Sequence, residues 1–391
     1  MTTGGGTTSG PTDDLLGALP QAAYAAAIAG LPGMGPAGLV DLLRGGDPEA
    51  VWRQLAAGEV RRPDPSPGRR VTSRRISWVD ATARVDVGDR WRHIRGAGIG
   101  VTFLGQPDYP SALGADPEPA GVLFWIGGLE ALTRPCVAVI GTRQCTSYGR
   151  TVAAQLGRDL ASAGVCVVSG MALGIDGAAH IGALEAGPDG AGPVGVGASG
   201  VDLPYPPRHA ALWAQVAQRG AVISETPPGH PAQTWRFPAR NRLVAGVSQA
   251  VVVVESHAGG GSMLTVGAAA DRGVDVLAVP GPVNSPASVG TNQLLHEGSA
   301  PARHAGDVLA ALGDFRPWPD QPHSRERSLA PAGLDGPTRR ILAAVDCTPT
   351  STSVIIERTG VPLGPLSTVL LRLESMALIR GEGTWWERRG R

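Results

Sequence analysis

The sequence contains no lysine, so arginine supplies all 34 of its basic residues. A P-loop needs a lysine to reach nucleotide phosphates, and a Schiff-base enzyme needs a lysine amine, so both kinds of chemistry are excluded. Acidic residues also number 34, which makes the formal net charge zero. A protein that coats DNA through a broadly basic surface is therefore excluded as well, and any nucleic-acid site has to be a local patch.

Cysteine is scarce, with four residues in 391. Their spacing is not that of a CxxC or Cys/His metal site, so we expect reduced thiols in a cytoplasmic protein, with no metal and no cofactor. The first residues lack the basic and apolar regions of a signal peptide. No apolar run is long enough to cross a bilayer, so we expect no membrane contact.

Composition and periodicity divide the chain into five predicted parts. Residues 1–12 are rich in Gly and Thr and are expected to be a disordered tail. Residues 13–100 have helical periodicity, residues 101–312 alternate between strand and helix patterns, and residues 313–332 have the Pro-rich composition of a linker. Residues 333–391 show three short helical patterns and a hairpin, the order of a winged helix.

The predicted N-terminal domain is small, helical and similar to SAM or helix–hairpin–helix domains. Its Pro-Gly-Met-Gly-Pro turn follows Leu31 and separates two helical segments. Such turns can present backbone N–H groups to DNA phosphates. No basic residues lie near this turn, so we favour a purely structural role for it.

The segment from residue 137 to residue 180 has the order strand, tight loop, helix, repeated twice. This order builds a parallel sheet, in which the loops after the strands meet at the carboxyl edge and bind ligands there. Because the alternation continues to residue 312, the sequence predicts an α/β domain with an extended Rossmann-like, doubly wound, mostly parallel sheet.

Four glycine- or arginine-bearing loops are expected to converge at this edge. One such loop alone would indicate only a tight turn, but several together, two of them with arginine, favour an anionic ligand. A dinucleotide is disfavoured, because the first loop lacks the GxGxxG pattern and no acidic residue is placed to hold a ribose.

A single strand of nucleic acid fits better, because it needs phosphate donors and planar groups for its unpaired bases. The segment from Trp235 to Arg242 supplies both, although Trp235 fits the edge of a packed core almost equally well. The predicted nucleic-acid-binding residues are Gly141, Thr142, Arg143, Ser169, Gly170, Met171, Ala172, Gly174, Arg236, Phe237, Arg240, Asn241, Arg242, Gly261 and Ser262.

Support for catalysis is weak, and we predict no catalytic residue. Asp176 and His180 lie four residues apart on one helix face and could be an acid/base pair, but such pairs more often cap a helix or satisfy a buried contact. Glu225 and Glu255 follow predicted strands, where structural carboxylates also bond loop N–H groups. Ser262 is expected to cap a helix.

The predicted recognition helix of the winged helix spans residues 363–376 and carries Arg372 as its only basic residue. A helix that reads bases usually carries more Arg, Asn or Gln. We therefore expect a protein contact or a weak DNA contact there, not sequence-specific recognition.

The motifs VAVIGTR, SGMALGIDGAAH and FPARNRLVAG occur in this order between Phe103 and Leu312. With them the sequence resembles the bacterial DNA-processing protein A family, also called Smf. The resemblance implies a non-enzymatic, single-stranded-DNA-binding recombination mediator, which protects incoming strands during natural transformation and loads the RecA recombinase. It also implies a homodimer formed through the Rossmann domain.

The resemblance assigns the family's phosphate loop to Gly141, Thr142 and Arg143, and a second basic and aromatic site to the segment from Arg236 to Arg242. Two features depart from the family. Leu173 stands where many members have a basic residue, and the loop at residues 259–261 is unusually rich in glycine.

The alternative function is a Rossmann-like nucleotide-binding protein or an enzyme of the nucleoside-monophosphate phosphoribohydrolase type. Such enzymes use Arg and Glu and carry a PGGxGTxxE motif. The nearest stretch here, residues 259–265, lacks the glutamate at the matching end.

Overall fold

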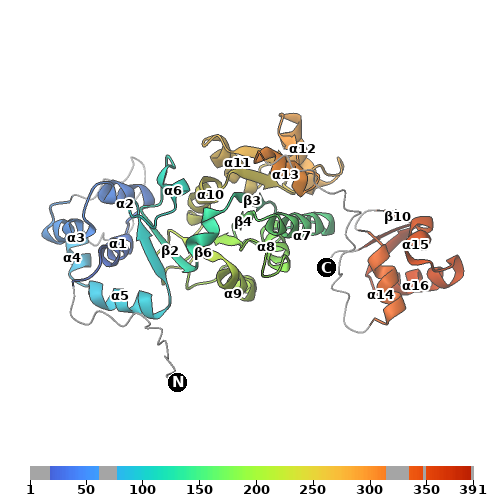
Figure 1. The fold of residues 1–391 in the computed structure, drawn as a ribbon, viewed down its shortest axis with the longest axis horizontal. Coiled ribbons are helices and arrows are strands. Elements are labelled where there is room, and N and C mark those ends of the chain that lie inside the picture. Colours follow the sequence, from blue (N-terminus) through green and yellow to red (C-terminus); the bar gives the residue numbers. More distant parts are fainter. Residues whose placement is uncertain (1–17, 61–76, 314–333, 347–348, 389–391) are drawn as a thin grey trace, which may run out of the picture. The chain divides into compact units, whose positions relative to one another are not determined.

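The computed structural model describes residues 18–60, 77–313, 334–346 and 349–388 (Figure 1). The chain divides into two compact units, one formed by residues 1–109 with 120–123 and the other by residues 110–119 with 124–391. The predicted tail at residues 1–12 and nearly all of the predicted linker at residues 313–332 lie outside the described residues.

The first unit is helical, as the periodicity predicts. Helix α3 begins at Pro48, because the Asp47 side chain accepts a hydrogen bond from the Glu49 N–H and proline suits the first turn. It ends at Ala57, and Gly58, which follows, takes the left-handed conformation that glycine adopts without strain. The elements of this unit are α1 (Gln21–Ala29), α2 (Pro36–Leu43), α3 (Pro48–Ala57), α4 (Trp78–Thr82), α5 (Val87–Gly96) and β1 (Gly100–Phe103).

Among the described residues, the larger sheet has nine strands, in the order β1-β2-β6-β5-β4-β3-β7-β8-β9. Strand β2 pairs antiparallel with β6, whereas β3 to β9 pair in parallel. The predicted Rossmann-like, mostly parallel sheet is thereby confirmed. The remaining strands are β2 (Val122–Gly127), β3 (Cys136–Ile140), β4 (Cys166–Ser169), β5 (Val194–Val196), β6 (Ala221–Ser224), β7 (Ala250–Val253), β8 (Asp275–Ala278) and β9 (Ala300–Pro301).

Helices α7 and α8 follow β3 and β4 and pack closely against each other. The contact requires glycine at two positions: a Cβ on Gly157 would lie 2.2 Å from the Ala179 carbonyl oxygen, and one on Gly182 would lie 1.9 Å from that of Ala154. The other helices of this domain are α6 (Ser111–Gly114), α7 (Ser147–Ser162), α8 (Ile175–Glu185), α9 (Ala210–Arg219), α10 (Arg236–Gly246), α11 (Ser262–Ala270), α12 (Val289–His296) and α13 (Ala305–Ala311).

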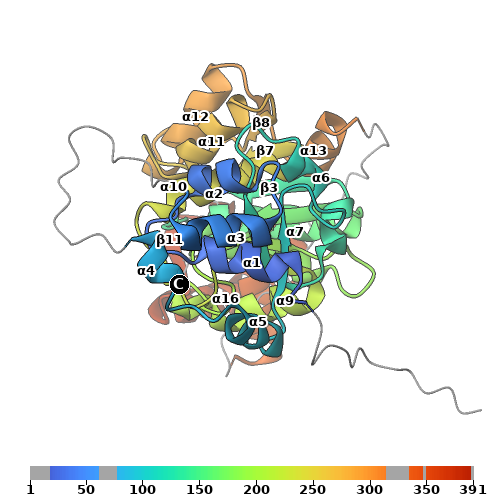
Figure 2. The same ribbon diagram turned by 90° about the vertical axis from the view of Figure 1, so that its left-hand side faces the viewer.

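Helices α11 and α12 lie beside β7 and β8 (Figure 2). The prediction that Ser262 caps α11 is wrong: the cap position is Gly261, and the helix begins at Ser262. The Ser262 hydroxyl instead lies 2.8 Å from that of Ser256, because the side chain turns back into the loop after β7.

The winged helix is also confirmed. Helix α16 buries Leu366, Leu370 and Leu373 in the core of this domain, while Leu363 and Leu371 remain exposed. Its basic residue, Arg372, lies 3.6 Å from Asp335. The elements are α14 (Gly336–Ala344), β10 (Thr350–Ser351), α15 (Thr352–Thr359), α16 (Leu363–Ser375), β11 (Ile379–Glu382) and β12 (Trp385–Arg388).

Within the described part of the chain, no single helix has the length and hydropathy needed to cross a membrane. Of the described helices, only the pair α15 and α16, counted as one segment, has that length and hydropathy, and the two helices are bent by 109° relative to each other.

Candidate nucleic-acid interface

A pocket of about 90 Å³ opens at the carboxyl edge of the sheet, where the loops after β3, β4 and β5 meet the first turns of α10. Five of the predicted site residues line it together. The complete lining consists of Arg143, Gly170, Ala172, Leu173, Ala198, Tyr205, Pro206, Phe237 and Arg240.

A guanidinium stacked on an aromatic ring forms one wall of the pocket. The Arg143 Cζ atom lies 5.2 Å from the centroid of the Phe237 ring, and Tyr205 packs against the same ring with centroids 5.5 Å apart. Arg143 is exposed, and no carboxylate of the described residues forms an ion pair with it. The cation–π contact therefore orients a guanidinium whose N–H donors remain open to an anion.

The backbone that carries Arg143 is fixed on two sides. The Thr142 N–H donates to the Glu255 carbonyl oxygen over 2.8 Å, and the Thr142 carbonyl accepts from the Ile175 N–H over 3.3 Å. Gly174 has a φ of 82°, and a Cβ there would lie 2.4 Å from the Thr142 oxygen. The β3 loop thus packs directly on the start of α8, which only glycine at position 174 permits.

The loop after β4 is held by a buried carboxylate. Asp176 accepts hydrogen bonds from the N–H groups of Gly170 and Ala172, over 3.1 and 3.3 Å. Between them, Met171 has a φ of 60° and a fully buried side chain, and its carbonyl lies 2.9 Å from Nδ1 of His209. The two N–H groups are thereby engaged within the protein, so this loop shapes the pocket but does not donate them to a phosphate.

Arg240 forms the positive floor of the pocket. It is buried, and its guanidinium donates to the carbonyl oxygens of Gly170 and Val196. Burial lowers the pKa of Arg240 to about 10, while the Asp176 carboxylate acts in the opposite direction. The side chain therefore stays charged at neutral pH but cannot move toward a ligand as Arg143 can.

The pair Asp176 and His180 does not line the pocket, which weakens the acid/base hypothesis. Burial raises the pKa of Asp176, and Arg240 opposes that shift. His180 is fully buried; neither ring nitrogen has a hydrogen-bond partner, although the Ser169 backbone lies close to the ring. Burial lowers the pKa of His180 to about 3, so the ring is neutral at physiological pH.

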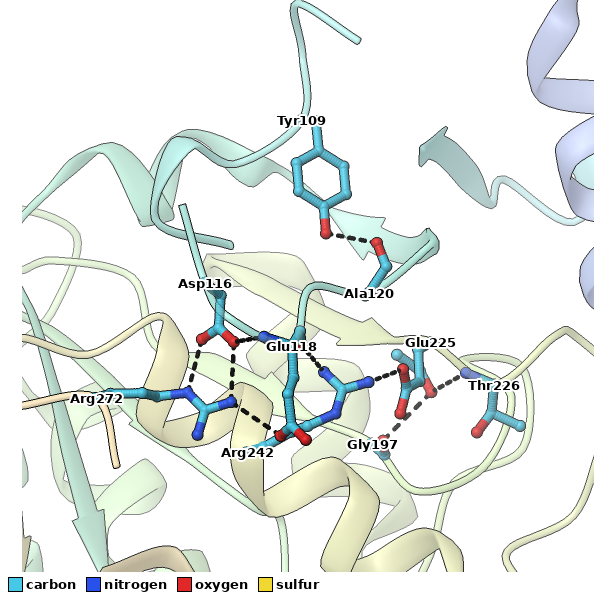
Figure 3. A network of polar contacts seen from close by, with 10 residues as sticks. Tyr109, Asp116, Glu118, Ala120, Gly197, Glu225, Thr226, Arg242 and Arg272 are labelled. Carbon is cyan, nitrogen blue, oxygen red and sulfur yellow. Dashed lines mark hydrogen bonds and ion pairs between the residues drawn. The ribbon is translucent and has the colours of Figure 1, made fainter. Parts of the chain in front are cut away.

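Several predicted site residues lie outside the pocket lining. Arg242 binds the Glu225 carboxylate at 2.5 Å and the Glu118 carbonyl oxygen at 2.7 Å (Figure 3). Arg236 donates to the Pro231 carbonyl oxygen and covers the Trp235 ring. The others are Gly141, Thr142, Ser169, Met171, Gly174, Asn241, Gly261 and Ser262. A role of these residues in DNA binding stays a prediction.

Four lining residues are absent from the predicted set. Leu173 lies in the loop after β4, and the other three, Ala198, Tyr205 and Pro206, follow β5, which pairs with β4. An aromatic residue in a loop after a parallel strand, here Tyr205, is the signal that could have identified this wall.

The start of α7 is a second place suited to an anion, and the protein fills it with its own carboxylate. Glu255 accepts hydrogen bonds from the Thr146 N–H at 2.9 Å and the Thr146 hydroxyl at 2.6 Å, and it is 1% exposed. A Cβ on Gly149 would lie 2.2 Å from this carboxylate. In dinucleotide-binding Rossmann domains, a pyrophosphate occupies the start of the equivalent helix. Across the described residues, no group of three or more His, Cys, Asp or Glu side chains could hold a metal ion.

Residues 100–313 match the family described as DNA recombination-mediator protein A. The chain is 35% identical to Protein Smf of Escherichia coli over 268 residues, which are 68% of this chain and 71% of that protein. It is 31% identical to Protein Smf of Synechocystis over 317 residues, 73% of this chain and 79% of that protein. The chain belongs to the DNA recombination-mediator protein A family.

Other features agree with membership of the DNA recombination-mediator protein A family. Residues 325–380 match the DprA winged helix domain. The solved structure of DNA processing protein A from Streptococcus pneumoniae is similar, with a TM-score of 0.61 and 27% identity over 75% of this chain and 98% of that one. A second similar structure is that of DNA processing protein A from Helicobacter pylori, solved to explain its single-stranded DNA binding mode. Its TM-score is 0.50, with 29% identity over 55% of this chain and 97% of that one.

Proposed function

We propose that this chain binds single-stranded DNA at the pocket formed by Arg143, Phe237 and Arg240, and that it acts as a recombination mediator. One observation carries the proposal: the Arg143 guanidinium is exposed, has no carboxylate partner among the described residues, and stacks on Phe237 at 5.2 Å beside a pocket. Phosphate oxygens need such open donors, and unpaired bases need planar groups on which to stack.

The pocket lining favours a strand over a small phosphate compound. Leu173, Ala198 and Pro206 give it apolar surface, and the floor guanidinium of Arg240 is occupied by carbonyl oxygens. A base can lie against the apolar surface while Arg143 contacts an adjacent phosphate. The single-stranded DNA binding described for the Helicobacter pylori relative supports this assignment.

The remaining parts of the proposal rest on membership of the family. We infer a homodimer formed through the Rossmann domain, with RecA as the protein partner that is loaded onto the bound strand. We also infer that the chain protects incoming strands in the cytoplasm during natural transformation, without catalysing a reaction.

The alternative of a nucleotide-processing enzyme gains no support from the site. That function would need a carboxylate free to act on a bound nucleotide, and Glu255 is buried and committed to Thr146. Asp176 is committed to the loop N–H groups in the same way. Both carboxylates have structural tasks, which favours binding over hydrolysis.

Replacing Arg143 tests the proposal. Arg143→Ala should weaken binding to labelled single strands of any sequence by roughly 10- to 150-fold, because a charge-assisted contact of about 1.5–3 kcal/mol is lost. The slope of log affinity against log salt should become shallower by about 0.7. Arg53→Ala, which removes an arginine whose side chain is 72% exposed on α3, is the matched control and should change neither quantity. Unchanged binding in the Arg143 variant would show that this pocket is not the DNA-binding site.

A further inference from the structure

A second pair of an aromatic ring and a guanidinium lies at the start of α10, outside the pocket lining. The Arg236 Cζ atom is 5.1 Å from the centroid of the Trp235 ring. This repeats the stacking of Arg143 on Phe237, where the distance is 5.2 Å. Trp235 and Phe237 are separated by one residue along the chain, so the two rings occur on one short segment.

Trp235 does not serve as the edge of a packed core, the alternative that its sequence context left open. It is 51% exposed, although a tryptophan is ordinarily buried for most of its surface. Arg236 stacks on the ring, and about half of the side-chain surface nevertheless stays exposed.

The exposed ring is held in one orientation. The indole Nε1–H donates to the Gln233 side-chain oxygen over 2.6 Å, and the stacked Arg236 is itself anchored, because it donates to the Pro231 carbonyl oxygen over 2.8 Å. A ring fixed before a ligand arrives loses little conformational entropy when a base stacks on it.

We propose that Trp235 is a second stacking platform, which takes an unpaired nucleobase of the same strand that the pocket binds. The inference rests on the proposed function and extends it, because it adds a base-binding ring two residues from Phe237 and outside the pocket lining. Base stacking on an aromatic side chain depends on the face of the base and not on its edge, so the platform should accept every base.

The experiment compares two strands of equal length, about 20 nucleotides, in a low-salt binding titration. One is oligothymidylate and the other carries abasic sites throughout, so both present the same phosphates but only the first presents bases. Trp235→Ala should lower the affinity for oligothymidylate by roughly 5- to 150-fold, the range that base stacking gives, and leave the affinity for the abasic strand unchanged.

Two further variants guard against a loss caused by misfolding. Trp235→Phe keeps an aromatic face and should retain most of the affinity for oligothymidylate. Trp385→Ala removes a tryptophan of equal exposure, 52%, from the winged helix, and should not reproduce the base-dependent loss.

The result that overturns the platform is unchanged affinity for oligothymidylate in Trp235→Ala, an equal loss on both strands, or the same base-dependent loss in Trp385→Ala. Failure of the proposed function is distinguishable, since the wild-type chain would then bind neither strand or Arg143→Ala would have no effect. If Arg143→Ala weakens binding to both strands and Trp235→Ala to neither, the stacking platform alone is refuted.

Discussion

Arg143 and Arg272 show two opposite uses of arginine in one domain. The Arg272 side chain is 6% exposed, and its guanidinium binds both oxygens of Asp116 at 2.7 and 2.9 Å, with Glu118 at 3.4 Å (Figure 3). Arg143, in contrast, is exposed, and it contacts the Phe237 ring and no carboxylate of the described part of the chain. In a chain without lysine, burial and partners decide whether an arginine stabilises the fold or remains available to a ligand.

The largest expected effect comes from breaking the buried ion pair. Asp116→Ala should lower the free energy of unfolding by about 3–5 kcal/mol, because it leaves the Arg272 guanidinium buried without its main partner. Chemical denaturation measures the loss. Glu185→Ala removes a partly exposed pair with Arg158 in the same domain and should cost about 0.2–1 kcal/mol. Equal losses in the two variants would mean that burial does not distinguish these arginines.

The buried His180 on α8 should make stability depend on pH. Its pKa is about 3 in the folded chain and 6.5 ordinarily, so the folded state binds fewer protons than the unfolded state between these values. Stability conferred by the neutral ring is complete above pH 6.5 and is lost as the pH falls toward 3. At about pH 4.5 the loss relative to pH 7 should reach about 3 kcal/mol.

His180→Leu removes this titration, and denaturation of both chains at the two pH values tests it. The difference in stability between pH 7 and 4.5 should shrink by about 3 kcal/mol in the variant. His93→Leu, at an exposed position on α5, is the control. An unaltered pH dependence in His180→Leu would contradict the role assigned to the buried ring.

Replacing glycine by alanine should matter at Gly170, which lines the pocket, and not at Gly261, which does not. A Cβ on Gly170 would lie 2.6 Å from the Arg240 guanidinium, whereas one on Gly261 would have nothing within 4 Å. Gly170→Ala should therefore destabilise the chain by about 1–3 kcal/mol and weaken strand binding through displacement of Arg240. Gly261→Ala should stay within about 0.5 kcal/mol of wild type. A neutral Gly170→Ala would show that Arg240 is not fixed.

The smallest effect is expected from the carboxylate at the start of α7. Glu255→Gln keeps the shape and loses the charge, so it should cost about 1 kcal/mol of stability, the value of a carboxylate near a helix start. Affinity for single strands should not change. The enzymatic alternative would be favoured if the wild-type chain released a free base from a nucleoside monophosphate and the Glu255→Gln variant did not.

The sequence predicts the architecture well, because most of the parallel strands are short apolar runs and the loops that follow β3 to β8 all carry glycine. It also identifies the residues of the pocket that lie next to those strands, such as Arg143 and Gly170. It does not reveal the wall formed by Tyr205, because that wall depends on β5 pairing with β4. The order of strands in a sheet comes from long-range pairing and not from local pattern.

Arg240 and Arg242 show that local sequence pattern also does not reveal which residues of one helix line the pocket. Both belong to a basic segment that looks uniform in the sequence, yet two positions on an α-helix differ by about 200° around its axis. Arg240 therefore reaches the pocket while Arg242 reaches Glu225. Only the packing of α10 against the sheet decides which of the two lines the site.

Single-strand binding by the wild-type chain can be measured by titration with labelled single strand, duplex and mononucleotide, at low and at physiological salt. We expect binding to the single strand in clear preference to the other two, with an affinity that falls steeply as salt increases. Tight binding of the mononucleotide, or an affinity for single strands that is indifferent to salt, would contradict this expectation.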